Sequence, residues 1–218
     1  MCFSASASFV TAGITGAVGL FALTRSHERR ERPLAAIPLF FAVQQSIEGL
    51  LWLGLAGAPE GSASSALTLA FLLFAEVFWP VYAPAAVWLI EPDRRRRLLM
   101  ACCLLAGVAV AAFFLWWITG HPHRAIILDG HIVYVTEDRR TDTIGIAYVA
   151  ATALPFLLSS LRGIMLLGAV ILTGMVTAYV FYWDAFVSVW CFFAAAASVA
   201  ILFHFERSRR SRSRTAEA

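Results

Sequence analysis

The sequence contains no lysine, so all 17 of its basic residues are arginine. This absence excludes a retinal Schiff base and every other covalent mechanism that depends on lysine. Charged residues of any kind are scarce, at 14% of the chain, whereas a soluble domain averages roughly a quarter. Cysteine is rare too, with four residues, and no CxxC, HExxH or HxxxH spacing marks a metal site. Nucleotide-binding loops and nucleophile elbows are also absent from the sequence.

Hydrophobic residues make up 60% of the 218 residues, and the mean hydropathy is +0.75. They lie in apolar stretches close to the ~20 residues that cross a bilayer core of about 30 Å. The stretches cover residues 5–24, 34–57, 64–90, 98–118, 143–161, 163–182 and 185–205. We therefore expect an all-α fold, a seven-transmembrane-helix bundle over residues 1–206, with a disordered basic tail at 207–218. The first stretch lacks a preceding basic region, so we expect a retained helix instead of a signal peptide.

The arginines are distributed asymmetrically between the loops of this seven-span arrangement. All but Arg124, Arg139 and Arg140 fall on one side, and the tail carries several of them. The positive-inside rule then predicts an N-terminus outside the cell and a cytoplasmic C-terminus, in a multi-pass protein of the plasma membrane. The expected partner of the basic tail is the lipid bilayer, and no nucleic acid is expected to bind.

The longest outer loop, residues 119–142, contains a signal for a β-hairpin. Asp129-Gly130 is a strong two-residue turn and is flanked by short runs rich in β-branched residues. The turn predicts that Leu128 pairs with His131 and that Ile126 pairs with Val133. Two roles remain open for the hairpin: a lid over the outer mouth of the bundle, or a stiffener of the loop.

Glu48 lies well inside the second apolar stretch, where a carboxyl group is costly and marks a candidate functional site. Gln44, Gln45 and Trp52 stand at i−4, i−3 and i+4 and share its helix face. The functional interpretations are a proton carrier, a metal ligand or a general acid/base. The structural alternative is a protonated carboxyl group that holds two helices together through a hydrogen bond.

Glu76 is the second acidic residue deep inside an apolar stretch, and Pro80 and Pro84 follow it. A proline removes a helical hydrogen bond, so we expect a bend in the helix beside this acid. Broken helices next to acidic residues are typical of transport and ion sites, but proline bends also occur in helices without a site.

Cys2, Ser4, Trp190 and Cys191 are expected at the same outer-leaflet depth as Glu48. Cys2 and Cys191 allow three interpretations: a disulfide, a zinc or copper site completed by Glu48, or two inert thiols. The metal interpretation uses the α-amine that Cys2 would expose after removal of Met1.

Several short motifs resemble those of an uncharacterised family of short bacterial multi-pass membrane proteins. They are Met1-Cys2-Phe3-Ser4-Ala5, Gln44-Gln45-x-x-Glu48-Gly49, Phe78-Trp79-Pro80 and Trp190-Cys191-Phe192-Phe193. The resemblance extends over most of the chain and implies a seven-helix membrane fold without an assigned activity. The chain is also similar in its number of helices to the membrane ceramidases and adiponectin-receptor relatives, which hydrolyse amides with zinc. It lacks their paired histidines, since His204 stands alone on the last helix.

The favoured interpretation is an integral membrane protein with an outward-facing polar pocket for a small solute, a proton or a metal ion. Its expected ligand-binding residues are Ser4, Gln44, Gln45, Glu48, Trp52, Glu76 and Trp190. One alternative is a membrane-embedded hydrolase with a metal at Cys2, Glu48 and Cys191. Another alternative is a structural or sensory partner of another membrane protein. The sequence predicts neither the ligand nor the oligomeric state.

Overall fold

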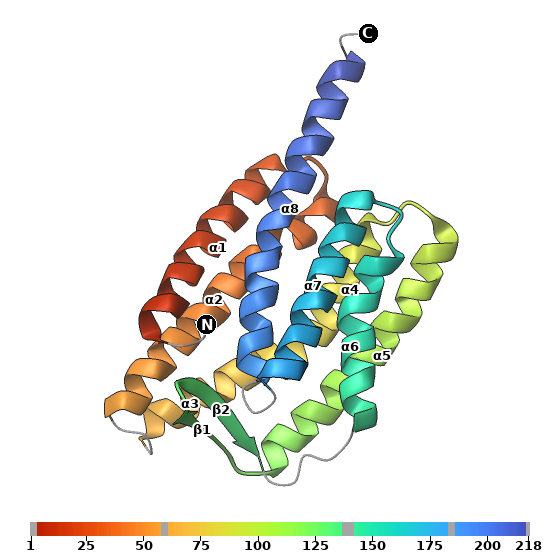
Figure 1. Ribbon diagram of the computed structural model, residues 1–218. Helices are drawn as coiled ribbons and strands as arrows, with labels where there is room; N and C mark the ends of the chain where they lie inside the picture. The colour runs from red at the N-terminus through yellow and green to blue at the C-terminus, as the bar shows by residue number, and fades with distance from the viewer. Residues whose placement is uncertain (1–3, 58–60, 137–141, 183–185, 217–218) are drawn as a thin grey trace.

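The computed structural model describes residues 4–57, 61–136, 142–182 and 186–216, which form a bundle of long helices with a hairpin at one end (Figure 1). The elements are α1 (Ala5–Arg25), η1 (Arg29–Glu31), α2 (Arg32–Gly57), α3 (Ser62–Leu72), the π-helical segment η2 (Leu73–Phe78), α4 (Trp79–Ile90), α5 (Arg94–Gly120), β1 (His123–Leu128), β2 (His131–Thr136), α6 (Asp142–Leu158), α7 (Arg162–Phe181) and α8 (Phe186–Ala216). Because α3, η2 and α4 follow one another without a break, they act as one long helix.

The helical prediction is confirmed, and most of the predicted spans are long enough to cross a membrane. Within the described residues, six helices have the required length and apolar composition. The apolar helix of the remaining stretch, Ile144–Leu158 in α6, is shorter. At 1.5 Å per residue it covers less than the ~30 Å of a bilayer core. The C-terminal helix α8 continues to Ala216, through the tail for which the sequence predicts disorder.

Small residues let α1 and α2 pack closely. A Cβ atom added at Gly19 would lie 2.6 Å from Leu39, and one at Gly16 would lie 3.5 Å from the Cβ atom of Ala42. In membranes such surfaces replace the hydrophobic driving force by close van der Waals contact between helices.

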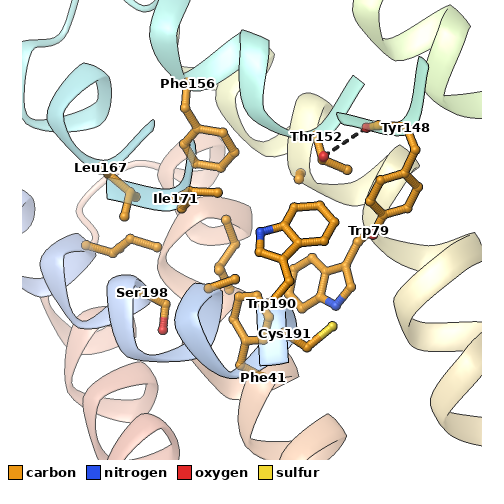
Figure 2. Close-up of a pocket in the computed structure, with 14 residues that line it drawn as sticks. Phe41, Trp79, Tyr148, Thr152, Phe156, Leu167, Ile171, Trp190, Cys191 and Ser198 are labelled. Carbon is orange, nitrogen blue, oxygen red and sulfur yellow. Dashed lines mark hydrogen bonds between the residues drawn. The ribbon is translucent and has the colours of Figure 1, made fainter. Parts of the chain in front are cut away.

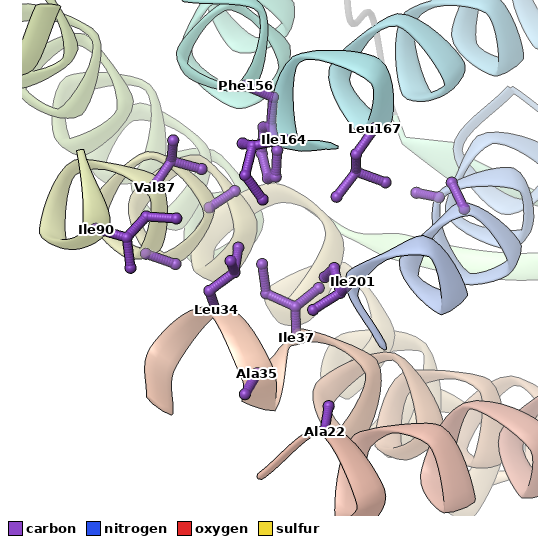
Figure 3. Packing of buried hydrophobic residues seen from close by; sticks show 14 of the residues in the cluster. Ala22, Leu34, Ala35, Ile37, Val87, Ile90, Phe156, Ile164, Leu167 and Ile201 are labelled. Carbon is purple, nitrogen blue, oxygen red and sulfur yellow. The ribbon is translucent and has the colours of Figure 1, made fainter. Parts of the chain in front are cut away.

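The largest apolar cluster lies where α1, α2, α4, α6, α7 and α8 meet, and its packing is shown in Figure 3. Ile37 of α2 lies against Ile201 of α8, and Leu34 of α2 points toward the middle of the cluster. Val87 and Ile164 close the cluster from α4 and α7. These side chains are almost fully buried. The cluster fixes the end of the bundle opposite the hairpin.

The third stretch changes helix type next to Glu76, where the sequence predicts a bend. Glu76 lies in η2, and Pro80 follows in the first turn of α4. In a π-helix each N–H bonds the carbonyl five residues back, so Pro80, which has no N–H, leaves the carbonyl of Ala75 open. The Tyr148 hydroxyl of α6 donates to that carbonyl at 2.5 Å. A side chain from another helix thus replaces the missing backbone donor.

Pro84 has a similar effect one turn later, because it cannot donate to the carbonyl of Pro80. Gly107 of α5 lies directly against this carbonyl oxygen, which a Cβ atom at position 107 would overlap. The absence of a side chain at Gly107 therefore allows α5 to pack against the proline-containing part of α4.

The hairpin has the predicted register. Leu128 pairs with His131 and Ile126 with Val133, and the turn residues have φ angles of 49° at Asp129 and 75° at Gly130. Positive φ at both positions is typical of a type I′ turn, which matches the twist of the strands.

The other face of the hairpin makes the deepest contacts with the bundle. Ala125 and Ile132 pack on Leu51 and Leu55 at the end of α2. Tyr134 extends the same face toward α3 and α8. The pairs singled out by the sequence, Leu128–His131 and Ile126–Val133, occupy the opposite face. Side chains alternate between the two faces of a strand, and both faces of this hairpin are largely apolar. The sequence alone therefore does not determine which face packs on the bundle.

A hydrogen-bonded carboxylate holds the opposite end of the bundle together. Glu91, at the end of α4, accepts from the Ser159 hydroxyl at 2.9 Å and from the Ser160 backbone N–H at 3.0 Å. Its other oxygen accepts from the Ser160 hydroxyl at 2.5 Å. Burial acts to raise the pKa of Glu91, but these hydrogen bonds outweigh it and lower the pKa. The contacts link the α4–α5 connection to the α6–α7 connection.

We expect acid to weaken this link at Glu91. Because the pKa is lowered in the folded protein, the stabilisation is complete above the ordinary value of 4.5. The stabilisation is lost as the pH falls through the lower pKa that Glu91 has in the folded protein, because the carboxylate then gains a proton. At pH 7 the Glu91→Gln variant should unfold at a lower temperature than the parent protein. Its unfolding temperature should not show the loss that the Glu91 carboxylate causes in the parent as the pH falls. Thermal unfolding in detergent from pH 3 to pH 7 tests this, and an unchanged acid response in the variant would contradict it.

Candidate functional site

Glu48 lies in the interior of the bundle and both of its carboxylate oxygens accept hydrogen bonds. Gln45 donates from Nε2 to Oε2 at 3.2 Å, and the Ser188 hydroxyl donates to Oε1. The side chains of Glu48, Gln44 and Gln45 are fully buried. No sequence pattern singles out Ser188, although it stands three residues before Cys191 on the same face of the last helix.

Gln44 connects three helices through its side-chain amide. Its oxygen accepts from the Trp79 indole N–H of α4 at 2.6 Å, and its nitrogen donates to the Cys191 sulfur of α8 at 3.2 Å. Both donor and acceptor functions of the amide are thus used in an apolar interior, which fixes its orientation.

Glu76 approaches the same place from η2. It is 4% exposed, and its neighbour Ala75 packs in one cluster with Cys191 of α8. The two acidic residues thus follow directly after residues, Ile47 and Ala75, that pack with Cys191. We call Gln44, Gln45, Glu48, Glu76, Ser188 and Cys191 the acidic centre.

The hairpin covers the acidic centre. The Tyr134 ring stacks on Phe71 with a centroid distance of 4.7 Å and an interplanar angle of 6°. It also packs against the cluster that contains Ala75 and Cys191. The predicted polar pocket is therefore closed in this structure, since the side chains of Gln44 and Glu48 are inaccessible to solvent.

The remaining residues of the predicted site lie elsewhere. Ser4 caps α1 by accepting from the Ala7 N–H at 3.2 Å. Trp52 packs at the end of α2 beside Leu51 and Leu55, under the hairpin. Trp190 is 6% exposed and packs with Ala178 of α7 and Tyr148 of α6. The position of Cys2 lies outside the described residues.

The predicted metal site is not complete in the described part of the chain. No group of three or more His, Cys, Asp or Glu side chains that could hold a metal ion occurs there. Glu48 and Cys191 supply two donors, whereas a zinc site usually needs at least three protein ligands. Cys191 carries a free thiol among the described residues, and the disulfide alternative also involves Cys2, which lies outside them.

A small cavity lies beside the acidic centre, between α2, α4, α6, α7 and α8, and Figure 2 shows its lining. Trp79 and Cys191 belong to both the cavity wall and the hydrogen-bond network of Gln44. The rest of the wall is mainly apolar, with Phe41, Phe156 and Ile171 among its members. The acidic centre and the cavity therefore share a boundary.

Comparison with known proteins gives one match over almost the full length. The model of a family of unknown function (DUF6629) matches residues 1–217. Neither a curated protein nor a solved structure matches the chain.

Proposed function

The chain belongs to the family of unknown function DUF6629, and we propose that it is an integral membrane protein whose acidic centre binds a proton or a small cation. One observation carries this proposal: the carboxyl groups of Glu48 and Glu76 are both buried, in an interior that excludes water. The sequence allows a small solute, a proton or a metal ion as the ligand, and the proposal keeps the proton and the cation.

The energetics of a low-dielectric interior support this choice. Keeping a carboxylate charged in such an interior costs several kcal/mol. A proton shared by the centre or a bound cation removes this cost. Glu48 receives hydrogen bonds from the neutral donors Gln45 and Ser188, which orient its oxygens without adding positive charge. The arginines of the described helices lie mostly at the end opposite the hairpin.

We place the hairpin on the outer face of the plasma membrane and the end of α8 in the cytoplasm. The helix order supports this placement, because the arginine-rich connections fall at the end of the bundle opposite the hairpin (Figure 1). The positive-inside rule assigns that end to the cytoplasm.

This orientation predicts the result of a topology experiment. A reporter fused after Ala218 or inserted at Pro92 should be active only in the cytoplasm. An epitope tag at Asp129-Gly130 should be reached by an antibody added to intact cells. A cytoplasmic tag in the hairpin would reverse the orientation and the direction from which a ligand enters.

Of the two roles left open for the hairpin, the contacts of Tyr134 favour the lid. Its ring covers the acidic centre through Phe71 and Cys191, whereas a loop stiffener needs no contact with the site. Movement of β2 away from the bundle would uncover the centre on the hairpin side.

A thiol-labelling experiment separates the two roles. In a background with Cys2, Cys102 and Cys103 replaced by serine, Tyr134→Ala should raise the rate at which a thiol reagent labels Cys191 by about tenfold or more, since about 1.4 kcal/mol of lost packing gives a factor of ten. The matched control is Ile127→Ala, at a hairpin position that is 42% exposed. Equal labelling of the two variants would contradict a lid.

Binding itself is tested by elemental analysis and equilibrium binding on purified protein. The proposal predicts uptake of a proton or of sodium, potassium or a divalent cation that is lost in Glu48→Gln and Glu76→Gln. Stoichiometric zinc or copper that requires Cys2 and Cys191 would favour the metal-dependent hydrolase instead. Cation uptake and proton release between pH 4 and pH 10 that are the same in the parent protein, Glu48→Gln and Glu76→Gln would refute the proposal.

A further inference from the structure

The cavity beside the acidic centre has features that the proton or cation site does not use. Its volume is about 50 Å³. One water needs roughly 10–15 Å³ of such space, so the cavity has room for about three to five non-hydrogen atoms. Apolar cavities of this kind stay dry and admit apolar molecules, because a water needs two to four polar partners.

The hydroxyl groups in the wall, including that of Tyr148, are already engaged as donors to backbone carbonyls. Thr152 donates to the carbonyl of Tyr148 at 2.8 Å, and Ser198 donates to the carbonyl of Ala195 at 2.6 Å. The wall therefore offers little to a charged or strongly hydrated ligand.

One polar group in the wall, the indole N–H of Trp190, is not engaged in this way in the part of the chain that the structure describes. The indole nitrogen of Trp190 is buried and has no hydrogen-bond partner within the described residues. Trp79, the other tryptophan of the wall, donates its N–H to Gln44. In Figure 2 the Trp190 nitrogen lies on the side of the ring that faces Phe156 and Ile171, across the cavity. A buried donor without a partner is rare in proteins, because leaving it unpaired is costly.

We infer that this cavity binds the carbonyl end of a small uncharged molecule, with Trp190 donating its N–H to the carbonyl oxygen. Such a ligand supplies the single acceptor that the indole requires, and its carbon atoms match the apolar wall. Its class is the ketones, esters and quinones, which dissolve in the hydrocarbon phase around the bundle. The inference is independent of cation binding at Glu48, although the two sites share the wall at Trp79 and Cys191.

The test compares two molecules of the same shape, 2-butanone and 2-methyl-1-butene, which differ only in the acceptor oxygen. Protein labelled with ¹⁵N-tryptophan is titrated in detergent, and the Trp190 indole signal is identified from its absence in Trp190→Phe. The ketone should move this signal downfield and should bind about 3- to 10-fold more tightly than the alkene, as expected for one hydrogen bond. In Trp190→Phe the preference for the ketone should disappear.

Ala194→Leu, which fills the cavity from α8, is the second variant and should abolish binding of both molecules. A Trp190 signal that is insensitive to the ketone would overturn the inference, as would an equal response in Ala194→Leu. Neither result depends on Glu48, so loss of cation binding in Glu48→Gln leaves this test intact.

Discussion

Glu48→Gln is expected to abolish binding of the proton or cation while changing the thermal stability of the protein little. Glutamine keeps the size of a protonated glutamate and much of its hydrogen bonding, but it cannot ionise. Interhelical hydrogen bonds in membranes average about 0.6 kcal/mol, so the loss of one contact to Ser188 or Gln45 is small. The measurement is the melting temperature in detergent with and without cations, since a ligand that binds the folded state raises it.

Glu48→Leu is the matched structural control. Leucine removes the acceptor of two buried donors, and each buried donor without a partner costs about 1–3 kcal/mol. This variant should therefore lose both binding and stability, whereas Glu48→Gln loses binding alone. If Glu48→Gln retained full cation-dependent stabilisation, the carboxylate would be a structural hydrogen-bond acceptor, and the acidic centre would have no binding role.

Gly107→Ala is expected to give the largest loss of stability among single-methyl changes in the bundle. The new Cβ atom overlaps the Pro80 carbonyl oxygen, a backbone atom that cannot rotate away. Overpacking of this kind costs about 1–3 kcal/mol, because α5 must move away from α4. Since Glu76 lies in the same continuous helix, cation binding should weaken as well.

Gly13→Ala provides the control for Gly107→Ala, because a Cβ atom at this position of α1 meets no atom within 4 Å. Alanine has a higher helix propensity than glycine, so this variant should be as stable as the parent or slightly more stable. Thermal unfolding of both variants in the same detergent makes the comparison. Equal melting temperatures would show that α5 and α4 do not pack at Gly107 as described.

Much of the helical architecture could be predicted because it depends on local properties of the sequence. The length of an apolar stretch is set by the bilayer, and the Asp129-Gly130 turn alone determines the hairpin register. A local irregularity in the helix near Glu76 was predictable from Pro80 for the same reason. Its form, a π-helical segment closed by Tyr148, was not, since the donor comes from a helix about seventy residues away in sequence.

Only part of the acidic centre could be predicted from the sequence. Gln44, Gln45 and Glu48 could be grouped because helical spacing places them on one face. Their partners Trp79, Ser188 and Tyr134 are set by how helices pack and how the hairpin docks, which are properties of pairs of distant segments. The face of the hairpin that docks was also undetermined, because both faces are apolar and a strand presents them alternately.

Infrared difference spectroscopy of the carboxyl groups is the most direct test of the acidic centre. Spectra of the purified protein are recorded before and after a pH step, and before and after addition of cations. We predict that the band of a protonated buried carboxyl group changes in the parent protein and is lost in Glu48→Gln, while Glu91→Gln keeps it. A band that is identical in the parent, Glu48→Gln and Glu76→Gln would contradict the proposal that this centre binds a proton or a cation.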